Sequence, residues 1–163
     1  MDIRKVYLYA LHREFEGKRF FVENADRLNN PVAASAFKNL AIEEQKHIEF
    51  IQSLLDAVDR SDAPPSISSS ELNEAGFFSQ RLASEAIDQT VYEAMVPDLP
   101  VLRMAYLIER DFAEFYEMAA YNADGAARQA LQMLARWERG HEKLFKQFHD
   151  QAYQAYSQMP WGG

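Results

Sequence analysis

The sequence predicts an all-α protein that folds as a four-helix bundle with a long crossover connection. Apolar residues recur at steps of three and four over four long segments, and glycine and proline number only six each. About 40 residues separate the second of these segments from the third. Short loops join antiparallel helices, whereas a connection of this length can run along the whole bundle. We therefore expect two helical hairpins joined by a crossover.

The first hairpin is expected in residues 2–58. Its first helix covers about residues 2–27 and ends near the sequence "NNP". Pro31 can open the second helix, because proline is well tolerated in the first turn. That helix is expected over about residues 32–58.

The crossover is expected in residues 60–97. It begins with "DRSDAPPSISSS", a stretch rich in Ser, Pro and Asp that is typical of a linker. Ser68 followed by Glu71 resembles a capping box. This pattern predicts a short extra helix over about residues 71–95.

The second hairpin is expected in residues 100–156. Asp98 can cap a helix over about residues 100–121, the sequence "NADG" turns the chain, and a last helix covers about residues 126–156. Residues 1–156 then form a single domain, and residues 157–163 form a loose tail.

The inward-facing positions of all four long helices are apolar except near their middle. There each helix places a glutamate, and two helices add a histidine three residues later. Glu-x-x-His places both side chains one turn apart on the same helix, where they can reach one metal ion. The residues concerned are Glu14, Glu44, His47, Glu109, Glu138 and His141.

Four glutamates in a protein core need positive charge nearby. An unpaired buried carboxylate costs several kcal/mol, and no lysine or arginine occupies the same inward positions. Two divalent metal ions balance four carboxylates and leave two neutral histidines as further ligands. A Glu from each of two helices plus Glu-x-x-His from each of the other two is the ligand set of di-iron and di-manganese bundles.

The two hairpins also repeat each other. "LAIEEQKH" aligns with "LARWERGH", and Glu14 aligns with Glu109. The two glutamates of a hairpin lie 30 residues apart in the first half and 29 in the second. One Glu-x-x-His is a weak motif, but two in matching register strongly indicate a metal site.

Neighbouring acidic residues and a tyrosine offer alternatives. The helical period places four further glutamates away from the inward positions, so we expect them in solvent: Glu16, Glu43, Glu114 and Glu117. Tyr116 follows Glu109 by two turns. Its hydroxyl could bind a ligand carboxylate, or it could simply be a core tyrosine with another partner.

Composition excludes several classes of function. The net charge is −8 with no basic stripe, so neither nucleic acid nor an anionic membrane surface is an expected partner. The absence of cysteine excludes disulfides and thiol nucleophiles. The first 18 residues lack the apolar core of a signal peptide, and no stretch is long enough to span a membrane. We expect a cytoplasmic protein.

With these motifs in place, the chain resembles the rubrerythrin-like branch of the ferritin-like superfamily. The matching pieces are "EFEGKRFFVENA" and "LAIEEQKH" in the first half, and "ERDFAEFYEMAA" and "LARWERGH" in the second. The resemblance implies a di-iron site with the six ligands above, in which Glu44 and Glu138 bridge the metals, although either glutamate pair could do so. Manganese or a mixed metal pair suits the same ligands.

The resemblance implies an oxidoreductase that reduces peroxide or dioxygen, with Tyr116 beside its ligands and a separate electron donor. A homodimer is also implied. The alternatives are ferroxidase or iron-handling activity, and a metal-stabilised bundle without turnover. The chain departs from the family in lacking a cysteine-ligated domain and in carrying Gly17 and Phe112 where a further carboxylate ligand is expected. Phe21 also stands where the repeat would match Tyr116.

Overall fold

The computed structural model describes residues 1–63, 65 and 87–160, and within these residues the chain is helical with no strand. Four long helices dominate. They are α1 (Ile3–Ala25), α2 (Pro31–Arg60), α6 (Leu99–Tyr121) and α7 (Gly125–Gln158), with the short α5 (Gln89–Glu93) and a 3-10 turn, η1 (Val96–Asp98), before α6. The predicted all-α class is confirmed.

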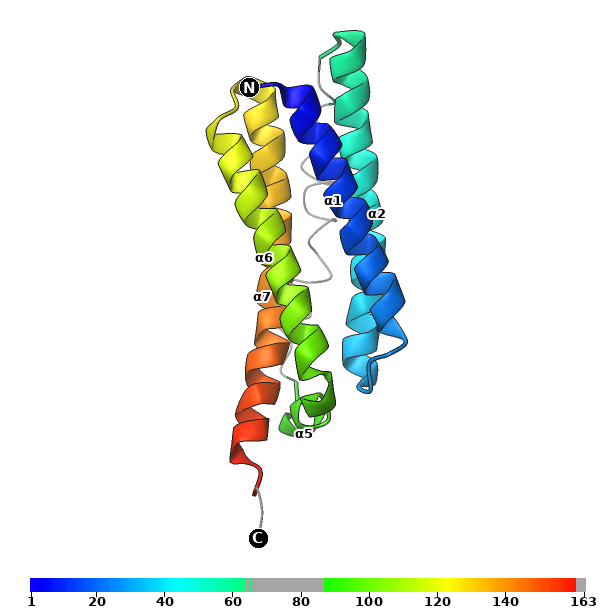
Figure 1. The fold of residues 1–163 in the computed structure, drawn as a ribbon, viewed down its shortest axis with the longest axis vertical. Coiled ribbons are helices and arrows are strands. Elements are labelled where there is room, and N and C mark those ends of the chain that lie inside the picture. The colour runs from blue at the N-terminus through cyan, green and yellow to red at the C-terminus, as the bar shows by residue number, and fades with distance from the viewer. Residues whose placement is uncertain (64, 66–86, 161–163) are drawn as a thin grey trace.

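The four long helices lie roughly parallel to one axis and form two hairpins, α1 with α2 and α6 with α7 (Figure 1). The end of α2 and the start of α6 lie at opposite ends of the bundle (Figure 1). The crossover therefore joins two helices that run in the same direction, which is the topology that the long connection predicts. None of the helices in the described part of the chain is both long and apolar enough to cross a membrane.

Local sequence explains where three of the long helices begin. Asp2 caps α1 by accepting a hydrogen bond from the backbone of Lys5, and Asn30 caps α2 by accepting two from the first turn. Pro31 occupies the first turn of α2 as predicted. Gly125 opens α7 with φ of 55°, a left-handed conformation that glycine adopts without strain.

The predicted role of Asp98 as a helix cap is wrong. It stands at the start of α6, but its side chain makes no capping hydrogen bond. Its carboxylate instead accepts hydrogen bonds from the backbone of Asn29 at 2.8 Å and of Asn30 at 2.9 Å. The side chain of Asn29 donates a third bond at 3.0 Å. Asp98, which is buried, therefore ties the α1–α2 turn to the second hairpin.

Only the last part of the helix expected over residues 71–95 falls within the described residues, and there the structure has a short helix. Ser68 and Glu71 lie outside the described residues, while α5 covers only Gln89–Glu93. Asp88 has an extended backbone and accepts a hydrogen bond from the backbone of Thr90, so a new helix begins there. The last helix, in contrast, runs two residues further than predicted, to Gln158.

The core consists of two apolar clusters, one toward each end of the bundle. The cluster near the start of α1 includes Tyr7, Leu54 and Leu131. The second includes Phe21, Phe37 and Phe145, whose ring centroids lie 5.1–5.4 Å apart. Along α1, Glu14 lies between Ala10 of the first cluster and Phe21 of the second, so a polar layer separates the two clusters.

Candidate metal centre

All six residues predicted as metal ligands meet in this polar layer. Their exposed fraction is 0% in each case, and they come from all four long helices. Their donor atoms form two groups, within each of which every atom lies within 4.8 Å of the others. The first group is Glu14, Glu44, His47 and Glu138, and the second is Glu44, Glu109, Glu138 and His141.

Glu44 and Glu138 belong to both groups. They face each other from α2 and α7, while Glu14 and Glu109 each belong to one group. The arrangement has the pseudo-twofold form that the sequence repeat predicts, with two shared carboxylates in the middle and one carboxylate and one histidine on either side.

Both histidines direct the same ring nitrogen, Nδ1, at the carboxylates. Nδ1 of His47 lies 2.8 Å from Glu138 Oε1 and 3.3 Å from Glu14 Oε2. Nδ1 of His141 lies 3.2 Å from oxygens of Glu44, Glu109 and Glu138. One ring nitrogen carries at most one proton, so it cannot donate to three oxygens at once.

Several carboxylate oxygens in the layer are left without a hydrogen bond. Among the residues that the structure describes, neither oxygen of Glu44 accepts one, and Oε1 of Glu109 does not either. Buried polar atoms normally have a partner, because desolvation without one costs about 1–3 kcal/mol. Carboxylate oxygens and imidazole nitrogens are ligands that iron and manganese accept. The donor set therefore fits two metal ions.

Charge in the layer is distributed unequally. Burial raises the pKa of Glu14 and Glu109, and the charges of neighbouring carboxylates raise it further. For Glu44 and Glu138 burial also acts to raise the pKa, but the positive charge of His47 and the nearby ring nitrogens of both histidines outweigh it and lower the pKa.

The histidines complete this balance. Burial acts to lower the pKa of His47 and of His141, but the surrounding carboxylates raise both well above the ordinary value of 6.5. Without metals the two histidines therefore favour the protonated form, and their positive charge offsets part of the negative charge of the four glutamates. Two divalent ions would bring four positive charges to the same layer and would displace these protons.

Comparison with known families supports the same view of the chain. The family model of rubrerythrin matches residues 5–149, which is nearly the whole sequence. The chain belongs to the rubrerythrin family. No curated protein matches it significantly.

One residue of this rubrerythrin-family site was missed by sequence reasoning. Glu43 was expected in solvent, but it is 4% exposed, and its Oε2 accepts a hydrogen bond from His141 Nε2 at 2.7 Å. The expectation was wrong because Glu43 lies beside the inward positions of α2, in line with the buried Ala36 and the partly buried Phe50 at spacings of seven. That apolar spacing was the available signal.

Glu43 makes the two halves of the site different. The residue at the matching position of the second hairpin is Trp137, whose ring stacks on that of His47 with centroids 4.9 Å apart. Within the described chain, Nε2 of His47 has no hydrogen-bond partner. His141 is therefore held by a carboxylate behind it, whereas His47 is held by an aromatic ring.

Tyr116 lies against the site, as one of its two predicted roles requires. Its hydroxyl donates a hydrogen bond to Glu14 Oε1, across the bundle from α6 to α1. Burial, and then the charge of Glu14, raise the pKa of Tyr116, so the hydroxyl keeps its proton. Three other glutamates were also expected in solvent, and the structure confirms that they are exposed: Glu16, Glu114 and Glu117.

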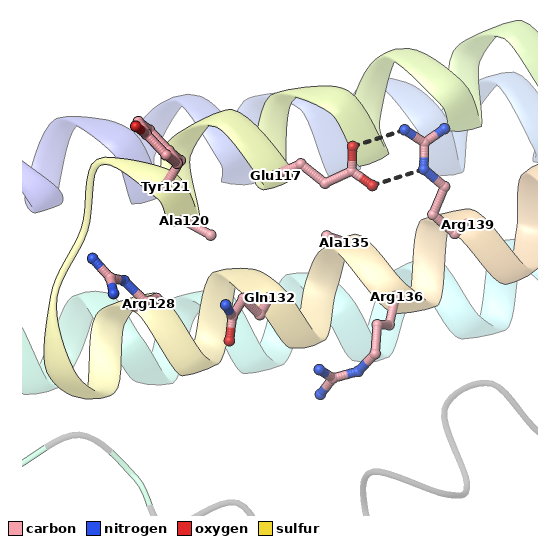
Figure 2. Close-up of a pocket in the computed structure, with 8 residues that line it drawn as sticks. All are labelled: Glu117, Ala120, Tyr121, Arg128, Gln132, Ala135, Arg136 and Arg139. Atoms are coloured by element: carbon pink, nitrogen blue, oxygen red, sulfur yellow. Dashed lines mark hydrogen bonds and ion pairs between the residues drawn. The ribbon is translucent and has the colours of Figure 1, made fainter.

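A surface cleft of about 570 Å³ lies between α6 and the first half of α7, away from the ligands (Figure 2). Figure 2 shows Arg128, Arg136 and Arg139 along its α7 wall, with Arg139 paired to Glu117 of α6. None of the six candidate ligands lines the cleft. Three arginines repel divalent cations, so the buried layer and not this cleft is the candidate metal centre.

Proposed function

We propose that the protein is a two-metal oxidoreductase, with iron as the preferred metal, that reduces peroxide or dioxygen. The observation that carries the proposal is the buried layer of four glutamates and two histidines, in which carboxylate oxygens lack hydrogen bonds. One metal would be held by Glu14 and His47 and the other by Glu109 and His141. Glu44 and Glu138, which belong to both groups, would bridge them.

Two ferrous ions bound there would supply the two electrons that reduce one molecule of peroxide. The residues of the chain have other tasks. Four carboxylates would balance the charge of two divalent ions, and the apolar clusters on both sides keep bulk water out. Tyr116 holds Glu14 in place through its hydroxyl.

Electrons for repeated turnover would come from outside this chain. A cysteine-ligated iron centre cannot form within it, because the sequence contains no cysteine. Manganese, or one ion of each metal, would satisfy the same carboxylate and imidazole ligands, and metal supply would decide between them.

Anaerobic iron loading followed by peroxide addition tests the proposal. The native protein should oxidise two ferrous ions for each peroxide consumed, since H₂O₂, two Fe²⁺ and two H⁺ give two Fe³⁺ and two water molecules. The double variant Glu44→Gln, Glu138→Gln should lose this activity, while the matched surface variant Glu49→Gln, Glu114→Gln keeps it. Iron that is bound at two per chain but does not react with either oxidant would refute the proposal.

A second candidate is a metal-stabilised bundle without turnover. The observation that favours it is the position of the layer, which separates the two apolar clusters and joins all four long helices. Metal binding would then act as folding energy. Chelation that unfolds the protein, together with bound iron that is inert to peroxide and dioxygen, would select this candidate.

A further inference from the structure

We propose that small neutral oxidants reach the metal centre through a passage between α1 and α6. Gly17 lines this passage, and the ring of Phe112 closes it. The inference rests on the proposed function, since it names the route to the same metals. It starts from a cleft of about 230 Å³ on this face. Residues of α1 and α6 line the cleft: Arg13, Glu16, Gly17, Ile108, Asp111 and Phe112.

Gly17 brings this cleft close to the ligands. A Cβ atom placed on Gly17 would lie 2.8 Å from Cε2 of Phe112 and 3.7 Å from Oε2 of Glu44. The Phe112 ring therefore occupies the space that a side chain at position 17 would fill, and an oxygen of Glu44 lies within van der Waals distance of the same space. Gly17 and Phe112, which both line the cleft, thus bring it close to a candidate ligand.

The Glu44 oxygen close to Gly17 is one of the atoms of the centre that lack a hydrogen bond in the described chain. Within the described residues, Oε2 of Glu44 accepts no hydrogen bond. Toward the two ends of the bundle, by contrast, the apolar clusters lie between the layer and solvent. On the face between α1 and α6, by comparison, the cleft residue Gly17 lies close to Glu44.

Phe112 is positioned as a movable cover. It is 5% exposed, and the guanidinium of Arg13 lies over its ring at 4.6 Å from the centroid. A cation above an aromatic face contributes only about 0.5–2 kcal/mol, which permits opening on a short timescale. Nη1 of Arg13 donates to the hydroxyl of Tyr9 at 3.1 Å, so the guanidinium is itself anchored.

The rim selects the class of ligand. Arg13 brings one positive charge, while Glu16 and Asp111 bring two negative ones, so the rim is net negative and disfavours anions. Nε of Arg13 is buried and, in the described chain, has no hydrogen-bond acceptor. This free N–H can bind an oxygen of a small neutral molecule. Hydrogen peroxide and dioxygen fit both conditions.

Nitric oxide, a neutral diatomic molecule that binds ferrous iron, tests the route without catalytic turnover. Protein loaded with two ferrous ions per chain is mixed with nitric oxide anaerobically, and the absorbance change is followed by stopped flow. Phe112→Ala should accelerate binding at least ten-fold at unchanged amplitude, and Phe112→Leu should do so by less. Phe148→Ala is the matched control, because it truncates a fully buried phenylalanine of the second cluster.

The outcomes separate the route from the function. Native binding rates in both Phe112 variants, or equal acceleration in Phe148→Ala, would overturn the proposed passage and leave the metal chemistry standing. A native loaded protein that binds no nitric oxide would instead refute the proposed reaction of small molecules at the metals. Iron content and helical circular dichroism of each variant confirm that the comparison is between folded, loaded proteins.

Discussion

Glu43 is predicted to set the affinity of one metal and not of the other. Its carboxylate is 4% exposed and accepts the Nε2–H of His141 at 2.7 Å, which fixes the proton on Nε2 and leaves Nδ1 free to bind a metal. Removing such a partner typically weakens metal binding about 10- to 100-fold, or about 1.4–2.7 kcal/mol. Glu43→Ala should show this loss on the His141 side, and Glu43→Gln a smaller one.

The chain provides its own reporter for the other metal. The ring of Trp137 lies 4.9 Å from that of His47, so a paramagnetic ion bound by His47 should quench its fluorescence. The sequence has a second tryptophan, Trp161, which a Trp161→Phe background removes. Calorimetric titration with Co²⁺ then measures both binding steps, while the fluorescence of Trp137 responds most strongly to the ion on the His47 side.

The expected result is that Glu43→Ala weakens one calorimetric step and leaves the fluorescence step unchanged. Glu49→Gln, an exposed glutamate on the same helix, is the control and should change neither. Equal weakening of both steps would show that Glu43 supports the fold in general. Native affinity at both steps would show that its hydrogen bond to His141 does not matter for metal binding.

Three further predictions follow from the same structure. The metal-free protein should lose free energy of unfolding as pH rises above 6.5, because His47 and His141 have raised pKa values and bind more protons in the folded state than in the unfolded state. Urea titrations from pH 6 to 8 measure this, and a free energy of unfolding that rises with pH would contradict it. Tyr116→Phe should lower the free energy of unfolding by about 1–3 kcal/mol, because Glu14 loses a buried hydrogen-bond donor. Two metal ions should still bind, and a loss of metal would show that the hydroxyl is needed for binding. Asp98→Ala should lower the free energy of unfolding by about 3 kcal/mol, because two backbone N–H groups lose their acceptor. Asp88→Ala, at the exposed start of α5, should lower it by about 1 kcal/mol. Similar shifts in the melting temperature of the two variants would contradict the role of Asp98 in joining the hairpins.

The sequence was sufficient for the fold and for the meeting of the six residues, for a physical reason. Each long helix has one inward face, and the period of 3.6 residues identifies it. Residues at the same height on four inward faces must meet if the helices pack in two antiparallel hairpins. Glu14, Glu44, Glu109 and Glu138 are at one height because the two hairpins repeat each other, and all four are fully buried.

Other features depend on contacts between helices that a period does not reveal. Glu43 lies beside the inward face of α2, and while its spacing from Ala36 and Phe50 indicates burial, its hydrogen bond with His141 of α7 cannot be seen from the period of α2. Asp98 follows the rule for a helix cap in sequence, but the backbone N–H groups of Asn29 and Asn30 compete for its carboxylate. Both partners are more than 60 residues away in the chain.

The most direct test of the metal centre is the metal content of protein purified without added metal, compared with that of Glu44→Ala, Glu138→Ala. The proposed centre predicts about two transition-metal ions per chain in the native protein and a loss of both in the variant. A native protein that contains none, and that takes up none from ferrous solution under anaerobic conditions, would show that the buried glutamates and histidines are balanced by protons alone.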